Sequence, residues 1–182
     1  MVTKAKLITA ADLMDMDEDA PFELIRGELV EVSPAKLRHA LVAGRFVEHF
    51  VLYSTTTFPG RVLVAEGGFF LERDPDSVIA PDVAFMRAER VPPKEVWDQY
   101  AQIAPDVVVE VLSPSNTRRR IAQKVEIYLK AGALLVLVAD PNRETVTVHT
   151  GDGRTRVYRV GEELDAGDAL PGFRVPIADL FK

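Results

Sequence analysis

The chain contains no cysteine among its 182 residues. Disulfide bonds, thiolate metal sites and cysteine nucleophiles are therefore excluded, and any chemistry must come from oxygen and nitrogen groups. The chain also lacks an apolar run of about 20 residues, which a membrane-spanning helix would need. Its first residues, MVTKAKLITAADLMDMDEDA, hold no apolar core of a secretory signal. Together these absences predict a cytoplasmic protein.

Basic residues are outnumbered as well, since 22 lysines and arginines face 28 acidic residues and give a formal net charge of -6. This balance argues against a protein that coats nucleic acid along its whole surface, so any nucleic-acid binding would have to be local. No Gly-x-Ser-x-Gly motif of a serine hydrolase and no phosphate-binding glycine loop is found. The length, with 47% hydrophobic and 27% charged residues, predicts one compact domain over residues 1–182.

Hydrophobic periodicity predicts an α/β (α+β) domain in layers. One helix is expected from residue 35 to about 54, and a second from about 117 to 131, ended by Gly132. The apolar face of the first helix is predicted to consist of Leu37, Ala40, Leu41, Gly44, Val47 and Val51. Strands are predicted at a hairpin around Gly27, at 82–86 and 106–112, and in LLVLVA, ETVTVHT and RTRVYRV. The expected sheet is mixed and mainly antiparallel, flanked by the two helices.

The five residues IAPDV occur twice, at 79–83 and at 103–107, and the second copy continues as VVEVLSPSN. Glu110 therefore lies inside an apolar strand, where an unpaired carboxylate would be strongly unfavourable. Two partners would relieve this cost. One is a salt bridge to the arginines at 118–120, and the other is a hard divalent cation.

Strand geometry distinguishes between the two aspartates of the repeat. Asp106 and Glu110 share a face of one strand but lie about 13 Å apart, too far to share one ion. Asp82 approaches Glu110 if strands 82–86 and 106–112 are antiparallel neighbours, and we predict that arrangement. Asp106 then becomes a residue that only begins its strand.

A cation is expected beside this pair. On the helix 117–131 the predicted buried arc consists of Ile121, Val125, Tyr128 and Leu129. Lys124 lies about 60° to one side of Ile121, on the flank of that arc. From there it either presents its ammonium group to Glu110 or only packs its stem against the sheet with the charge in solvent.

Two carboxylates, a lysine and a divalent ion form a site that can hydrolyse phosphodiesters. Pro81-Asp82, Glu110 and a following lysine resemble the PD-(D/E)xK nuclease superfamily. More specifically, the chain resembles the Uma-type family of restriction endonuclease domains, formerly a domain of unknown function. The blocks that carry the resemblance, in order, are FELIRGELVEVSP, RHALVAGRF, APDVAFMRAER, APDVVVEVLSPSN, KVEIYLKAG, VADPNRETVTVH and LPGFRVPIADLF.

The resemblance implies a restriction-endonuclease-like fold and a Mg²⁺ or Mn²⁺ ion held by Asp82 and Glu110. It also implies that Lys124 is the catalytic lysine, because Leu112 occupies the usual E-x-K position. Relatives often carry an acidic residue where this chain has arginines at 118–120. That triplet either contacts a phosphate backbone or neutralises a nearby carboxylate.

Two further residues are candidates. Glu66 is either an additional metal ligand or an exposed hairpin residue, and His39 is either close to the site or a packing residue. The expected function is a metal-dependent endonuclease acting on nucleic acid, with DNA expected as the substrate over RNA. The expected assembly is a homodimer, in which two sites cut the two strands of a duplex. The alternative is a non-catalytic nucleic-acid-binding or regulatory protein that keeps a nuclease-like fold.

Overall fold

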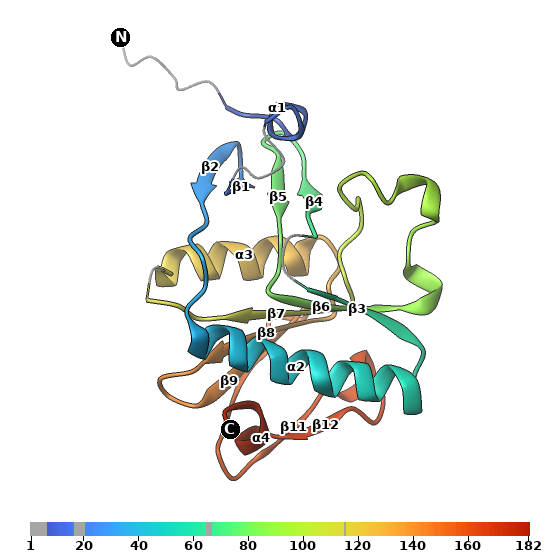
Figure 1. Ribbon diagram of the computed structural model, residues 1–182, viewed down its shortest axis with the longest axis vertical. Helices are drawn as coiled ribbons and strands as arrows, with labels where there is room; N and C mark the ends of the chain where they lie inside the picture. Colours follow the sequence, from blue (N-terminus) through green and yellow to red (C-terminus); the bar gives the residue numbers. More distant parts are fainter. Residues whose placement is uncertain (1–6, 17–20, 65–66, 115) are drawn as a thin grey trace.

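A six-stranded sheet forms the middle of the molecule in the computed structural model, which describes residues 7–16, 21–64, 67–114 and 116–182 (Figure 1). Its strands are β3 (Gly60–Val64), β6 (Val83–Arg87), β7 (Val107–Val111), β8 (Leu135–Asp140), β9 (Thr145–Thr150) and β10 (Thr155–Arg159). They run in the order β10-β9-β8-β7-β6-β3. The pair β7 and β8 is parallel, and every other neighbouring pair in this sheet is antiparallel.

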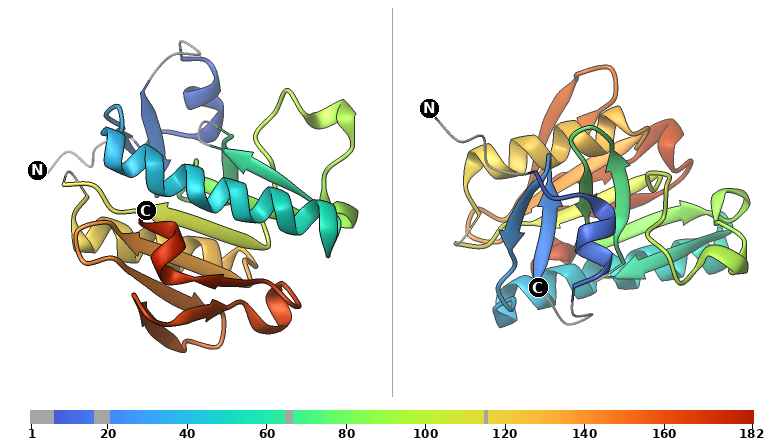
Figure 2. Two further views of the ribbon diagram at one scale, coloured as in Figure 1. Left: turned by 60° about the horizontal axis from the view of Figure 1, so that its bottom comes forward. Right: turned by 90° about the horizontal axis from the view of Figure 1, so that it is seen from above.

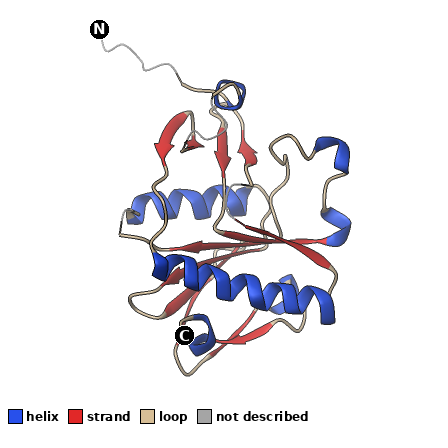
Figure 3. Ribbon diagram, viewed as in Figure 1, coloured by secondary structure: helices blue, strands red, loops and turns tan. Residues whose placement is uncertain are grey.

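Two long helices cover opposite faces of this sheet, as Figures 1 and 3 show. Helix α2 (Leu37–Thr56) packs on one face, and α3 (Arg118–Lys130) packs on the other, where its Ile127 and Tyr128 are fully buried. The mixed, mainly antiparallel sheet flanked by two helices is therefore confirmed. In the described parts of the chain, none of the helices offers the long apolar stretch that crossing a membrane requires.

A second sheet packs against α3 and faces the viewer in the right-hand view of Figure 2. Its strands are β1 (Phe22–Ile25), β2 (Glu28–Glu31), β4 (Phe69–Glu72) and β5 (Ser77–Ile79), in the order β2-β1-β5-β4. The short helix α1 (Ala10–Met14) lies beside it and is capped by Thr9, whose side-chain oxygen accepts a hydrogen bond from the Asp12 amide. Between β5 and β6 the chain passes from the second sheet to the main one, and Asp82 lies in that crossing.

The C-terminal tail, from residue 163 to 182, contains further regular elements. These are the antiparallel pair β11 (Glu163–Asp165) and β12 (Arg174–Pro176) and the helix α4 (Ile177–Leu180). Short 3₁₀ turns occur at Ala88–Arg90, Lys94–Val96 and Gly167–Ala169. Buried side chains of the tail join the core beneath α2, and these are Leu164, Leu170, Phe173, Val175, Ile177 and Leu180. Tertiary packing, which the tail sequence does not reveal, orders these elements.

The helix α2 is found where it was predicted, but the face assigned to the core is wrong. Its buried residues are Val42, Phe46, Phe50 and Tyr53. From the predicted set, Leu37 is 74% exposed, Leu41 is 56% exposed and Val51 is 45% exposed. Both sets repeat at helical spacing, so periodicity could not separate them. The face with Phe46, Phe50 and Tyr53 is the buried one because its larger side chains remove more apolar surface from water against the sheet.

Candidate functional site

The strands β6 and β7 are antiparallel neighbours, as predicted, with Val83 opposite Val109. One further step in the same register brings Asp82 beside Glu110. The Asp82 carboxylate reaches across this end of the pair, where its Oδ2 accepts a hydrogen bond of 2.6 Å from the Val111 amide. The fold thus brings together the two carboxylates proposed as metal ligands, which lie 28 residues apart in the chain.

Glu110 is 3% exposed and fully engaged by side chains of α3. The Lys124 Nζ donates to both of its carboxylate oxygens at 3.1 Å, and the Tyr128 hydroxyl donates to Oε1 at 2.9 Å. Burial raises the pKa of Glu110 to about 7, against the opposing pull of the Lys124 charge. The arginines at 118–120, one of the two partners considered from the sequence, make no salt bridge to Glu110 among the described contacts.

Lys124 lies at the centre of the buried face of α3 and not on its flank, and it is 8% exposed. Its Nζ also forms a salt bridge of 2.9 Å to Glu23 Oε1, which accepts a second hydrogen bond from the Ala80 amide. Burial alone would lower the pKa of Lys124, but the two carboxylates outweigh it and raise this pKa above its ordinary value. The lysine is therefore held in its charged form between two strands of different sheets.

Glu23 is a residue of this cluster that sequence reasoning missed. It belongs to β1, comes from the second sheet and is 8% exposed. The signal was present, because a glutamate within the apolar stretch FELI presents the same problem of desolvation as Glu110 in VVVEV. Glu23, like Glu110, therefore needs a charged or hydrogen-bonding partner.

His39, at the start of α2, contacts the same site. Its Nε2 lies 3.1 Å from Asp82 Oδ2, and this hydrogen bond raises the pKa of the imidazole above its ordinary value, against the opposing effect of burial. The helix thus contributes to the site through a side chain that orients one carboxylate.

Replacing His39 by glutamine should reduce the free energy of unfolding by about 1 kcal/mol below pH 6.5. Because the pKa of His39 is raised on folding, this contribution is complete below the unfolded pKa and is lost as pH rises through the folded pKa. Urea unfolding of both proteins at several pH values measures the gap. His49→Gln is the matched control, since burial lowers the pKa of His49 and its pH dependence should have the opposite sign. A His39→Gln gap that stays constant up to pH 9 would contradict this assignment.

Asp106, the other aspartate of the repeat, has a different environment. It is 1% exposed and lies at the opposite end of β7 from Glu110. Arg90 forms an ion pair with its Oδ1 at 2.6 Å, and the Arg87 amide donates to its Oδ2 at 2.8 Å. Both oxygens are thus engaged in joining the loop after β6 to the start of β7.

The remaining candidates are Glu66 and the arginines at 118–120. Glu66 lies outside the described residues. Arg118, Arg119 and Arg120 form the first turn of α3, and within the described parts of the chain none of their guanidinium groups has an ion-pair or hydrogen-bond partner. The triplet therefore does not neutralise a described carboxylate.

The donor set is compatible with a Mg²⁺-type ion. In the described residues no group of three or more His, Asp or Glu side chains is arranged to hold a metal. Mg²⁺ nevertheless usually takes one or two carboxylates and completes its shell with waters and substrate phosphates. Asp82, just before β6, and Glu110, in the adjacent strand β7, could supply two such carboxylates, and Asp82 keeps one oxygen, Oδ1, outside its two hydrogen bonds.

A family model, Uma2, described as "Putative restriction endonuclease", matches residues 10–178. The chain belongs to the Uma2 family. The resemblance recognised in the sequence blocks is thus confirmed over nearly the whole chain. A comparison with curated proteins gave no match.

A solved structure with a similar fold is described as "a putative nuclease belonging to DUF820" from Anabaena variabilis ATCC 29413. The two chains are 22% identical and superpose with a TM-score of 0.84, covering 96% of this Uma2 chain and 97% of the other. At this identity the likeness establishes the fold. It confirms the predicted α+β class with a nuclease-like arrangement.

Proposed function

We propose that this Uma2 protein is a metal-dependent endonuclease that hydrolyses phosphodiester bonds in nucleic acid, with Asp82 and Glu110 as ligands of a Mg²⁺ or Mn²⁺ ion and Lys124 as the catalytic lysine. The observation that supports the proposal is the antiparallel register of β6 and β7, in which residue 82 comes next to residue 110, while the buried ammonium group of Lys124 donates hydrogen bonds to Glu110. Membership of a family described as restriction endonucleases supports the same reaction class.

Each residue has a distinct part in the reaction. In hydrolysis a water oxygen bonds to phosphorus, the bond from phosphorus to the leaving sugar oxygen breaks, and that oxygen takes up a proton. The bound ion would supply Lewis acidity and a more acidic water. Lys124 would stabilise the charge that develops on the phosphate, and His39 would keep the Asp82 carboxylate oriented.

Glu23 explains how Lys124 could serve in such a site. The lysine occupies both oxygens of Glu110, the same oxygens that an ion needs. Its second salt bridge, to Glu23, would keep the ammonium group in place when Glu110 turns to the ion. Glu23 is therefore a positioning residue in this proposal, and acts through the lysine.

A second function is favoured by one observation. Both oxygens of Glu110 are already satisfied by Lys124 and Tyr128, which is also what a site without metal would need. A non-catalytic nucleic-acid-binding or regulatory protein would keep this cluster only for its stability. The homodimer expected from the sequence stays a prediction under either function.

Nicking of supercoiled plasmid separates these functions. With millimolar Mg²⁺ or Mn²⁺, we expect the wild-type protein to convert supercoiled DNA to open circles, and Glu110→Gln to reduce the rate by about a hundredfold or more. Glu126→Gln is the matched control, because it makes the same change at an exposed site on α3 and should nick at the wild-type rate. No nicking by wild type with either ion, or equal nicking by Glu110→Gln, would favour the non-catalytic function.

A further inference from the structure

The acidic chain carries a basic rim at the end of the main sheet where β7 and β8 finish. We use the term basic rim for the following six residues: Lys36, Arg38, Arg118, Arg119, Arg120 and Arg143. They come from three segments, which are the start of α2, the start of α3 and the loop between β8 and β9. In Figure 1 these segments meet along one edge of the molecule, on the left of the view.

Contacts tie the three segments together. The Leu112 amide donates to the Ala139 carbonyl at 2.8 Å, which joins the loop leading to α3 to the end of β8. The Arg38 guanidinium donates to Asn142 Oδ1 at 3.3 Å, which joins α2 to the loop after β8. The rim is therefore a property of the fold, although its members are scattered over more than 100 residues of sequence.

Most charges of the rim have no carboxylate partner in the described parts of the chain. Arg143 forms a salt bridge of 2.9 Å to Asp140, but no carboxylate partner is found among the described residues for the other five cations. Three of them occupy the first turn of α3, which holds no acidic residue and where the helix dipole disfavours positive charge. Several exposed arginines outside the rim are paired with carboxylates, for example Arg174 with Asp165 at 2.8 Å and Arg154 with Asp152 at 2.6 Å. An anionic partner would relieve this local excess of positive charge.

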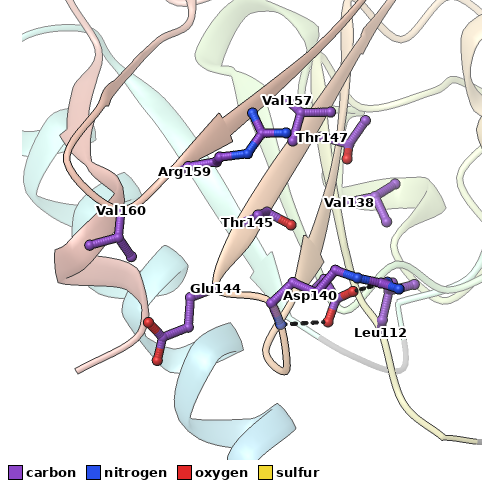
Figure 4. Close-up of a pocket in the computed structure, with 10 residues that line it drawn as sticks. Leu112, Val138, Asp140, Glu144, Thr145, Thr147, Val157, Arg159 and Val160 are labelled. Atoms are coloured by element: carbon purple, nitrogen blue, oxygen red, sulfur yellow. Dashed lines mark hydrogen bonds and ion pairs between the residues drawn. The ribbon is translucent and has the colours of Figure 1, made fainter.

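An open cavity of about 570 Å³ lies along the α3 side of β8, β9 and β10 (Figure 4). It begins at Leu112, two residues after Glu110, and it includes Val138, the register partner of Glu110. Threonine and valine side chains of the strands form its floor, and its lining also includes Arg159 and the ion pair of Arg143 with Asp140. The carboxylate of Glu144, which also lines the cavity, points away from this floor in Figure 4.

The chemistry of the lining favours a backbone over bases as the ligand. None of the ten residues that line the cavity is aromatic, so the lining offers no surface on which a base could stack. Guanidinium groups at its edges match phosphate oxygens, and the small floor side chains leave room for a sugar-phosphate chain. Leu112 of the cavity and the arginines at 118–120 of the rim both follow β7, the strand that carries Glu110.

We infer that the basic rim and this cavity together bind the phosphodiester backbone of nucleic acid, without reading its sequence, and lead it to the carboxylates. This inference rests on the proposed function for its substrate class. It would explain how a protein with a net charge of -6 binds a polyanion, because the positive charges of the basic rim are concentrated at one end of the main sheet.

Binding can be measured apart from cleavage, by fluorescence anisotropy of labelled duplexes in EDTA over a range of salt concentrations. The test variant is the double substitution Arg118→Gln and Arg119→Gln, which removes two exposed cations of the rim. We expect its affinity to fall about tenfold or more at low salt, and the slope of log K against log salt to shrink by about 2. A DNA duplex and an RNA duplex of the same sequence identify which backbone is preferred.

The matched control is the double substitution Arg154→Gln and Arg174→Gln, which makes the same change in net charge at exposed sites outside the rim and the cavity. It should retain the wild-type affinity and salt slope. Equal losses in both variants, or no binding of either duplex by the wild-type protein, would overturn the inference. Failure of the two proposals is distinguishable: rim-dependent binding without nicking contradicts only the endonuclease, and nicking with rim-independent binding contradicts only the inference.

Discussion

Replacing Lys124 by methionine should lower the free energy of unfolding by about 3–5 kcal/mol near pH 8. The substitution keeps most of the buried stem but removes the charge that compensates Glu110 and Glu23, both less than 10% exposed. Two buried carboxylates would then face each other without a cation. Urea unfolding at equilibrium, followed by circular dichroism, measures the loss.

The loss should depend on pH in a defined direction. Burial already raises the pKa of Glu110 to about 7, and without the Lys124 charge, which lowers it, that pKa must rise further. Because the folded pKa exceeds the unfolded one, the variant is most stable where Glu110 is protonated and loses stability as pH rises through the folded pKa. The deficit should therefore be smaller near pH 5 than near pH 8.

Lys130→Met is the matched control, since it makes the same substitution at an exposed position on the same helix. Lys130 is paired only with Glu126 on the surface, so its loss should change the free energy of unfolding by less than about 0.5 kcal/mol. If Lys124→Met lost no more than this control at pH 8, the buried ion cluster would not contribute as argued.

Sequence reasoning recovers the convergence of the site because each step depends on local rules. The cost of burying Glu110 demands a partner, and the spacing of 3.3 Å per residue along a strand rules out Asp106. Antiparallel pairing then selects Asp82, and the register of β6 and β7 agrees. These steps require only the local sequence around each residue and one assumption, that the two strands are antiparallel.

What the sequence does not predict depends on contacts between distant elements. Glu23 joins Lys124 because the second sheet packs on α3, and no spacing rule connects residue 23 to residue 124. The buried face of α2 depends on the comparison of two apolar arcs, of which the one with Phe46 and Phe50 packs against the sheet and the tail. Periodicity finds a helix, but the partner surface decides which side is buried.

The repeated IAPDV segment gives the sharpest test of the site, because one substitution can be made in both copies. Asp82→Asn should abolish nicking, with a reduction of about a hundredfold or more, and should remove the rise in melting temperature that millimolar Mg²⁺ or Mn²⁺ is expected to cause. The asparagine can still accept the hydrogen bond from the Val111 amide, so the fold should lose less than about 1 kcal/mol.

Asp106→Asn should have the reverse effects. It leaves Arg90 without its buried partner and should lower the free energy of unfolding by about 2–3 kcal/mol. Below its melting temperature the variant should still nick plasmid at a rate near wild type and should still gain stability from the ion, because Asp106 lies at the far end of β7 from Glu110. The two aspartates occur in identical pentapeptides but lie at opposite ends of β7. Nicking that survives in Asp82→Asn but disappears in folded Asp106→Asn would mean that the wrong aspartate has been assigned to the metal.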